Sequence, residues 1–113
     1  MHEMSITMSM MEIVREHMEK NRVKRLKKLR IRVGELTALE PQSLIFCFEI
    51  YTKGSHMEGA TLEIENVPLK GRCGDCKKEF CIDGFSFDCP ACNSNSIENI
   101  SGHELDIISI EAE

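Results

Sequence analysis

The sequence lacks the features that mark several large functional classes. Its 113 residues include no tryptophan and one tyrosine, and the phenylalanines at 80, 85 and 87 are not interleaved with basic residues as in a base-stacking platform. The seven glycines are scattered and form neither a phosphate-binding loop nor a dinucleotide-binding fingerprint. Any nucleotide energy must therefore come from a partner. The longest unbroken apolar run, 44–48, is too short to span a membrane.

An overall excess of positive charge is also missing. Fourteen basic residues stand against nineteen acidic ones, a net charge of −5, which argues against a general nucleic-acid binder. Segment 20–32 nevertheless holds eight of the basic residues and no acidic one. We interpret it as a solvated helix end and strand face, with Arg30 and Arg32 pairing with Glu63 and Glu65 of a neighbouring strand. The alternative is a zinc-ribbon module that binds nucleic acid, for which salt-dependent DNA or RNA binding would be diagnostic.

Hydrophobic periodicity predicts two helices. The first spans 4–20, and its apolar face is made by Ile6, Met10, Ile13, Val14 and His17. The second begins at Pro41 and ends near Gly54. Its inner stripe is formed by Leu44, Cys47, Phe48 and Tyr51.

Alternating polar and apolar residues predict three strands, at 26–36, 60–67 and 104–111. We expect an α+β fold, with two helices packed on a three-stranded sheet and a cysteine-rich zinc-ribbon module inserted between the last two strands. The predicted domains are 1–68 plus 98–113, and 69–97. The first 25 residues carry charge throughout and show no signal-peptide core, so we expect a cytoplasmic protein.

The strongest motif is a pair of CxxC turns, Cys73 with Cys76 and Cys89 with Cys92, twelve residues apart. Two such turns facing each other form the tetrahedral sulfur site that zinc prefers. Disulfides fit a reducing compartment less well, and a redox CxxC usually occurs once rather than as two matched turns. Four cysteine ligands leave no open position, which favours a structural metal. Cys47 and Cys81 remain outside the motif: we expect a buried helical residue and a strand residue, with Cys81 as a substitute ligand the lesser alternative.

The N-terminus, Met1-His2-Glu3, offers a second set of metal ligands. The Met1 amine, the His2 backbone nitrogen and the His2 imidazole together close two chelate rings, and planar nitrogen donors suit Ni(II) or Cu(II). Glu3 adds a further donor. From the residues alone, a solvated tail is the competing interpretation.

Several segments together resemble the HypA/HybF family of hydrogenase nickel-incorporation proteins. They are the N-terminal Met-His-Glu-Met-Ser, the segments at 30–36, 46–49 and 59–64, both CxxC pairs and the C-terminal strand. The resemblance implies a nickel metallochaperone that binds Ni(II) through His2, with Glu3 beside it, and holds zinc at the four cysteines. It also implies work with the GTPase HypB on the large subunit of [NiFe]-hydrogenase, and in some members on urease maturation. The resemblance implies neither a membrane nor a nucleic acid as a binding partner, and it leaves open whether the protein is a monomer or a dimer.

Two further alternatives concern methionines and histidines. A copper carrier would use Met4, Met8 and Met11, although helical spacing places Met4 and Met11 at the flank of the core. A hydrolase would use His17, His56 or His103 as a base, but no nucleophile accompanies them in a recognisable set. We therefore expect a binding protein and not an enzyme.

Overall fold

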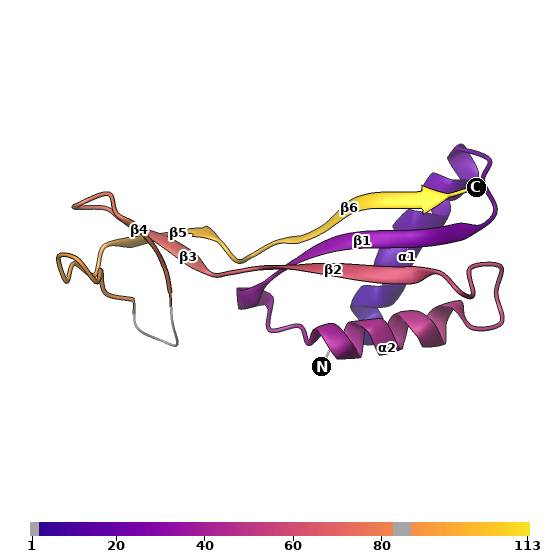
Figure 1. Cartoon of the computed structure of the whole chain (residues 1–113), viewed down its shortest axis with the longest axis horizontal. Helices are drawn as coiled ribbons and strands as arrows, with labels where there is room; N and C mark the ends of the chain where they lie inside the picture. Colours follow the sequence, from indigo (N-terminus) through magenta and orange to yellow (C-terminus); the bar gives the residue numbers. More distant parts are fainter. Residues whose placement is uncertain (1–2, 83–86) are drawn as a thin grey trace. The chain divides into compact units, whose positions relative to one another are not determined.

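The computed structural model describes residues 3–82 and 87–113, which form two helices and two small sheets (Figure 1). The elements of the first sheet and its helices are α1 (Glu3–Lys20), β1 (Leu26–Gly34), α2 (Pro41–Thr52), β2 (Thr61–Val67) and β6 (Leu105–Ala112). A short 3-10 turn, Glu35–Thr37, follows β1. In the described residues, neither helix is long and apolar enough to cross a membrane.

The chain divides into two compact units. The first contains Met1–Arg32, Leu39–Glu65 and Asp106–Glu113, and the second contains Val33–Ala38 and Asn66–Leu105. The module predicted between the last two strands of the larger sheet is present, because β3 (Lys70–Cys73), β4 (Glu79–Cys81) and β5 (Ile97–Ser101) all lie between β2 and β6 in the sequence. The predicted α+β class, with two helices and an inserted four-cysteine module, is confirmed.

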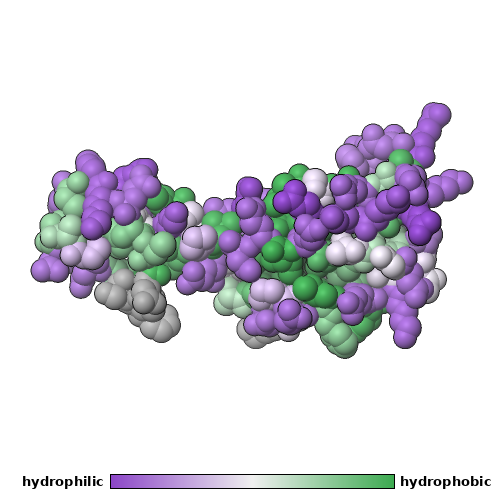
Figure 2. Space-filling model, viewed as in Figure 1, coloured by the Kyte–Doolittle hydropathy of each residue, from purple (hydrophilic) through white to green (hydrophobic). Residues whose placement is uncertain are grey.

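The sheet of the first unit has the strand order β2-β1-β6, so β1 is central. Its apolar side chains are buried, with Leu29 and Ile31 of β1 at 0% and 1% exposure. On the opposite face, Lys28, Arg30 and Arg32 form ion pairs across to Glu63 and Glu65 at 2.8, 3.4 and 3.0 Å. The predicted cross-strand pairing of the arginines is therefore correct, and hydrophilic side chains cover this sheet in Figure 2. Because this face is solvated, the helices pack on the other.

The buried face of α1 differs from the predicted one. It is formed by Thr7, Met10, Met11, Val14 and Met18. Ile13 is 57% exposed and His17 is also exposed, so placing these two in the core was wrong. The helix packs against α2. This contact turns the buried face of α1 toward the methionines, whose flexible side chains fill irregular gaps.

The inner stripe of α2 follows the prediction more closely. Leu44 and Phe48 are fully buried, while Cys47 and Tyr51 are half-buried. The Glu40 side chain caps the helix by accepting a hydrogen bond from the Gln42 amide at 3.2 Å. Pro41 occupies the first turn, where the N–H that proline lacks would have no partner within the helix. The outer face carries Phe46 and Ile50, at 61% and 47% exposure. Hydrophobic side chains are accordingly visible over α2 in Figure 2.

The second sheet has the order β4-β3-β5, with β3 antiparallel to both neighbours. From the sequence, the apolar residues between the two cysteine pairs, Phe80, Ile82, Phe85 and Phe87, are expected to form the core of a hairpin, and β5 is not expected. Ile82 is buried, but Phe87 is 44% exposed, and Phe85 lies outside the described residues. The small core instead arises where β4 and β5 flank β3, so the module depends on residues after the second cysteine pair.

A close backbone contact joins the end of β1 to the segment before β6. The Gly34 amide donates to the Glu104 carbonyl at 2.6 Å, and the Leu36 amide donates to the Gly102 carbonyl at 2.8 Å. A Cβ atom added at Gly34 would lie 2.1 Å from the Gly102 oxygen. No side chain therefore fits at position 34 without displacing backbone.

Gly34→Ala is expected to lower the free energy of unfolding by about 3 to 4 kcal/mol, through steric overlap and loss of the Gly34–Glu104 hydrogen bond. Urea unfolding followed by circular dichroism measures this change. Gly54→Ala is the control, because Gly54 has a φ of +78° with open space around it and should lose only about 1 kcal/mol from backbone strain. Equal losses for the two variants would contradict the steric explanation.

Candidate metal centre

Two turns with the same hydrogen-bond pattern carry the four cysteines. In the first turn, the Lys77 amide donates to the Cys73 carbonyl at 3.0 Å. In the second, the Asn93 amide donates to the Cys89 carbonyl at 2.9 Å. Lys77 and Asn93 both have positive φ, 69° and 60°, which reverses the chain directly after the second cysteine of each pair. The CxxC spacing thus builds two equivalent loops.

Backbone amides in each loop point at the first cysteine sulfur. The amides of Asp75 and Cys76 both lie 3.4 Å from the Cys73 Sγ, and the amide of Ala91 lies 3.4 Å from the Cys89 Sγ. Such donors stabilise a thiolate more than a thiol. Cys73 and Cys89 are also the two buried cysteines, whereas Cys76 and Cys92 are exposed. The cluster is therefore supported from one side and open to solvent on the other.

The four sulfur atoms converge on one point. All lie within 4.8 Å of one another, with Cys73 Sγ to Cys92 Sγ and Cys76 Sγ to Cys89 Sγ both at 3.5 Å. A disulfide needs about 2.05 Å, so these are not bonded pairs; all six cysteines are free. A tetrahedral metal with sulfur ligands at about 2.3 Å requires sulfur separations of about 3.8 Å. The observed distances fit such an ion.

Within each loop, the pKa of the first cysteine is lowered and that of the second is raised. The Cys76 amide, with that of Asp75, lowers the pKa of Cys73 to about 6. Burial raises the pKa of Cys89, but the Cys92 and Ala91 amides outweigh it and the net shift is downward.

The second cysteine of each loop shifts the other way. The Ser94 amide lowers the pKa of Cys92, yet the Cys73 sulfur and burial together raise it to about 12. The pKa of Cys76 is raised too, because the effects of the Cys89 sulfur and burial exceed that of the Lys78 amide. The first thiol of each loop thus loses its proton more readily than the second. A divalent cation would supply the missing positive charge and release those protons.

Contacts around the loops hold them in register. The Gly74 amide donates to the Ser96 carbonyl at 2.7 Å, and the Ser94 hydroxyl bonds the Asp75 carboxylate. The first contact ties the first loop to the segment leading into β5, and the second links the loops directly. Sequence reasoning missed Asp75 and Ser94, and no motif would have revealed them.

The remaining sequence-predicted ligands fall outside this cluster. Cys81 lies in β4, as expected for a strand residue, and Cys47 is half-buried on α2 rather than fully buried. Met11 is fully buried, while Met4 and Met8 are 37% and 51% exposed, so the three thioethers do not share one environment. Among the described residues, the four cysteines are the only group of three or more candidate ligands.

The N-terminal ligands are described only in part. Met1 and His2 lie outside the described residues. Glu3 is the first residue of α1, and its Oε2 accepts a hydrogen bond from the Glu40 amide at 3.4 Å. That bond joins the beginning of α1 to the beginning of α2. Glu3 therefore links the first turns of the two helices.

Four convergent thiols on a small α+β scaffold define a metal-binding protein, and comparison with known proteins narrows the class. Residues 1–112 match the family model described as "Hydrogenase/urease nickel incorporation, metallochaperone, hypA". The class is thus the nickel-incorporation metallochaperones, which are not enzymes.

Curated relatives specify the family. The chain is 44% identical over 115 residues to the hydrogenase maturation factor HypA of Desulfosudis oleivorans, covering 98% of this chain and 97% of that protein. It is 40% identical over 118 residues to the same factor of Lawsonia intracellularis, with complete coverage of both. The chain belongs to the HypA family.

Solved structures agree with the fold. The protein titled "Solution structure of HypA protein" aligns with a TM-score of 0.72 and 25% identity, over 100% of this chain and 97% of that one. The nickel metallochaperone HypA of Helicobacter pylori aligns with a TM-score of 0.65 and 24% identity, over 99% and 97%. At that identity the second likeness supports the fold alone.

Proposed function

We propose that this protein binds Ni(II) at its N-terminus and delivers it into the large-subunit precursor of [NiFe]-hydrogenase, with urease as a second destination. The observation that carries the proposal is membership of a nickel-incorporation family across residues 1–112, in a chain that opens Met1-His2-Glu3. Nickel here is cargo. A site that must release its ion benefits from few ligands at a chain end, because such a site opens without unfolding the protein.

The nickel ligands in this proposal are the Met1 amine, the His2 backbone nitrogen and the His2 imidazole. These donors favour a planar nitrogen geometry, which Ni(II) accepts and zinc does not. Glu3 is a weaker candidate ligand than these three donors, because its carboxylate already accepts a hydrogen bond from the Glu40 amide. Amine and imidazole must both lose protons to bind, so nickel affinity falls as the pH falls.

The four-cysteine site is proposed to hold zinc as a resident structural ion. The donor set is all sulfur, the separations suit a tetrahedral ion, and no position is left for a substrate. Residues 69–97 then form the zinc-binding domain, and residues 1–68 with 98–113 form the nickel-binding domain. A module this small buries too little surface to fold on its own, so the ion contributes much of its stability.

The partners in this proposal are the GTPase HypB and the hydrogenase precursor. The chain has no phosphate-binding loop, so GTP hydrolysis must belong to a partner. Six free cysteines are the state expected in the reducing cytoplasm, where the protein is proposed to work as a monomer or dimer.

A Ni(II) titration of zinc-loaded protein with a native, untagged N-terminus tests the function. A copy acetylated at Met1 is the matched control, and both metals are quantified in each. We expect saturable nickel binding in the native form and its loss on acetylation, with zinc retained. Equal binding in both forms would remove the amine from the site. No nickel in either would instead indicate a zinc-ribbon interaction module without nickel function.

A further inference from the structure

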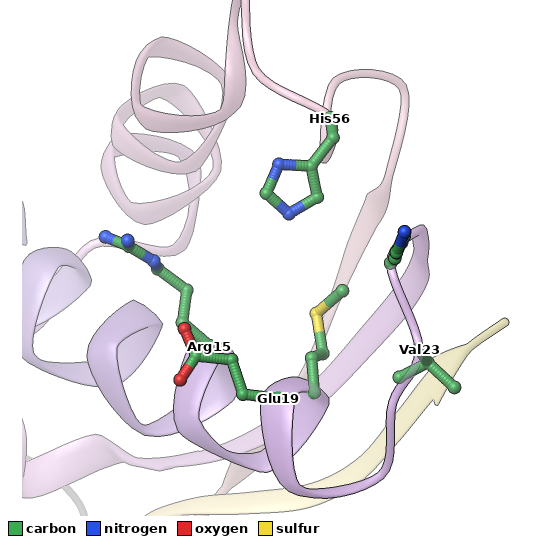
Figure 3. A pocket seen from close by; sticks show the side chains of 6 residues that line it. Arg15, Glu19, Val23 and His56 are labelled. Carbon is green, nitrogen blue, oxygen red and sulfur yellow. The ribbon is translucent and has the colours of Figure 1, made fainter.

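A pocket of about 310 Å³ lies in the first unit, at the C-terminal end of α1. It is lined by Arg15, Met18, Glu19, Val23, Lys24 and His56. Figure 3 shows Arg15 and Glu19 reaching it from the helix, Val23 from the turn that follows, and the imidazole of His56 from the turn after α2. A space of this size accommodates one or two side chains of a ligand.

The helix terminus itself builds the apolar floor. The Arg22 amide donates to the Glu19 carbonyl at 3.2 Å, and the Val23 amide donates to the Met18 carbonyl at 3.1 Å. Arg22 has a φ of 56°, which completes a Schellman cap without the usual glycine. This cap places Val23 against Met18, which is 3% exposed. The floor is thus fixed by backbone hydrogen bonds rather than by side-chain packing alone.

Positive charge collects beside this floor and is only partly neutralised. Four of the eight basic residues in 20–32 are paired with glutamates of β2 or with Glu113. The other four form the basic turn, defined as Lys20, Arg22, Lys24 and Arg25. All four side chains are exposed, and none has an ion pair within the part of the chain described. Arg15 adds a further cation inside the pocket, where its side chain hydrogen-bonds Tyr51 and lies one helical turn from Glu19, the single acidic residue lining the pocket.

We propose that this pocket is a docking site for an acidic peptide segment of a partner protein. One carboxylate of the segment binds between Arg15 and Lys24, and an adjacent aliphatic side chain packs on Met18 and Val23. Charge complementarity favours this occupant: the pocket and the basic turn are an exception in a chain whose net charge is −5. A purely aliphatic ligand would leave the basic turn without an anionic partner, and a bare anion would leave the apolar floor uncovered.

The position of the pocket suits a carrier protein. It lies at the C-terminal end of an 18-residue helix, about 27 Å along the axis from the residue that follows His2. A partner held there leaves the N-terminal end of α1 free. The inference does not depend on nickel, and its test contains no nickel, so it stands or falls separately from the proposed function.

The test is a chemical-shift titration of ¹⁵N-labelled, zinc-loaded protein with the peptide acetyl-Leu-Glu-Glu-Leu-amide. We expect saturable binding, with a dissociation constant on the order of 1 mM or tighter. The shifts should centre on Met18, Val23, Lys24 and His56. The matched peptide acetyl-Leu-Gln-Gln-Leu-amide should bind at least about tenfold more weakly, and 0.5 M NaCl should weaken the acidic peptide markedly.

Charge variants separate the pocket from overall charge. Lys24→Glu should weaken binding at least about tenfold, and Lys24→Gln should lie between it and the native protein. Lys70→Glu makes the same change in net charge at an exposed position of β3 and should leave binding within about twofold. The proposal is overturned by equal binding of both peptides, by full binding to Lys24→Glu, by shifts elsewhere, or by displacement with inorganic phosphate at equal concentration.

Discussion

Cys73→Ala is expected to remove the metal from the four-cysteine site and unfold the module around it. Cys73 is fully buried at the end of β3, its sulfur receives two amide hydrogen bonds, and it lies 3.5 Å from the Cys92 sulfur. The three remaining sulfurs cannot enclose a tetrahedral ion. Structural zinc contributes on the order of 10 kcal/mol to small modules of this kind. We therefore expect bound zinc to fall from one ion per chain to nearly none.

The loss should be confined to one unit. Amide spectra should show collapsed dispersion for residues of the second unit, while α1 and α2, which have their own core, keep native signals. Cys81→Ala is the matched control, because Cys81 is an exposed cysteine of β4 outside the sulfur cluster, and it should retain a full zinc ion. Stoichiometric zinc in Cys73→Ala would show that three cysteines suffice and that the site is not a closed tetrahedral one.

The metal cluster was the part of the site most accessible from the sequence. A CxxC turn is a local structure, so its spacing alone fixes where two sulfurs point, and a second turn at the right distance supplies the other pair. Asp75 and Ser94 were beyond reach because their contact joins the two loops. That contact depends on how the loops face each other, which spacing does not record.

The same distinction separates the correct elements from the wrong ones. Strand β1 was predicted together with one of its neighbours, β2, because Leu29 and Ile31 alternate with Arg30 and Arg32 and charge complementarity identifies that neighbour. The face of α1 was predicted wrongly because Ile13 is more hydrophobic than Thr7, yet Thr7 faces the core. The packing of α2 against α1 decides which face of α1 is buried, and a helical wheel of α1 alone does not include that contact.

The pocket at the end of α1 had no sequence signal at all. Its floor requires Arg22 in a left-handed conformation. Glycine usually occupies that position in a helix C-cap and is its sequence signal, and it is absent here. The basic segment was recognised, but its division into paired and unpaired halves depends on which glutamates lie opposite. The sequence predicted the pairs of Arg30 and Arg32, but those of Lys27 with Glu113 and Lys28 with Glu63 follow from the sheet order β2-β1-β6.

His2→Ala is expected to abolish specific nickel binding while leaving the zinc site and the fold unchanged. The substitution removes the imidazole and with it one of the two chelate rings, so nickel affinity should fall by more than about a hundredfold. Equilibrium dialysis against Ni(II), with zinc quantified in the same samples, measures both metals. His17→Ala is the control: His17 is an exposed histidine of α1 and should leave nickel affinity unchanged.

The two metal predictions separate the proposed roles, because each variant should lose one ion and keep the other. Cys73→Ala retains the N-terminal donors, and His2→Ala retains all four sulfurs. Planar nitrogen and tetrahedral sulfur select different ions, so neither site is expected to rescue the other. Full nickel affinity in His2→Ala would make the N-terminal assignment wrong. If that nickel were then lost in Cys73→Ala, the four-cysteine site would be where the cargo binds, and the structural role given to it would have to be abandoned.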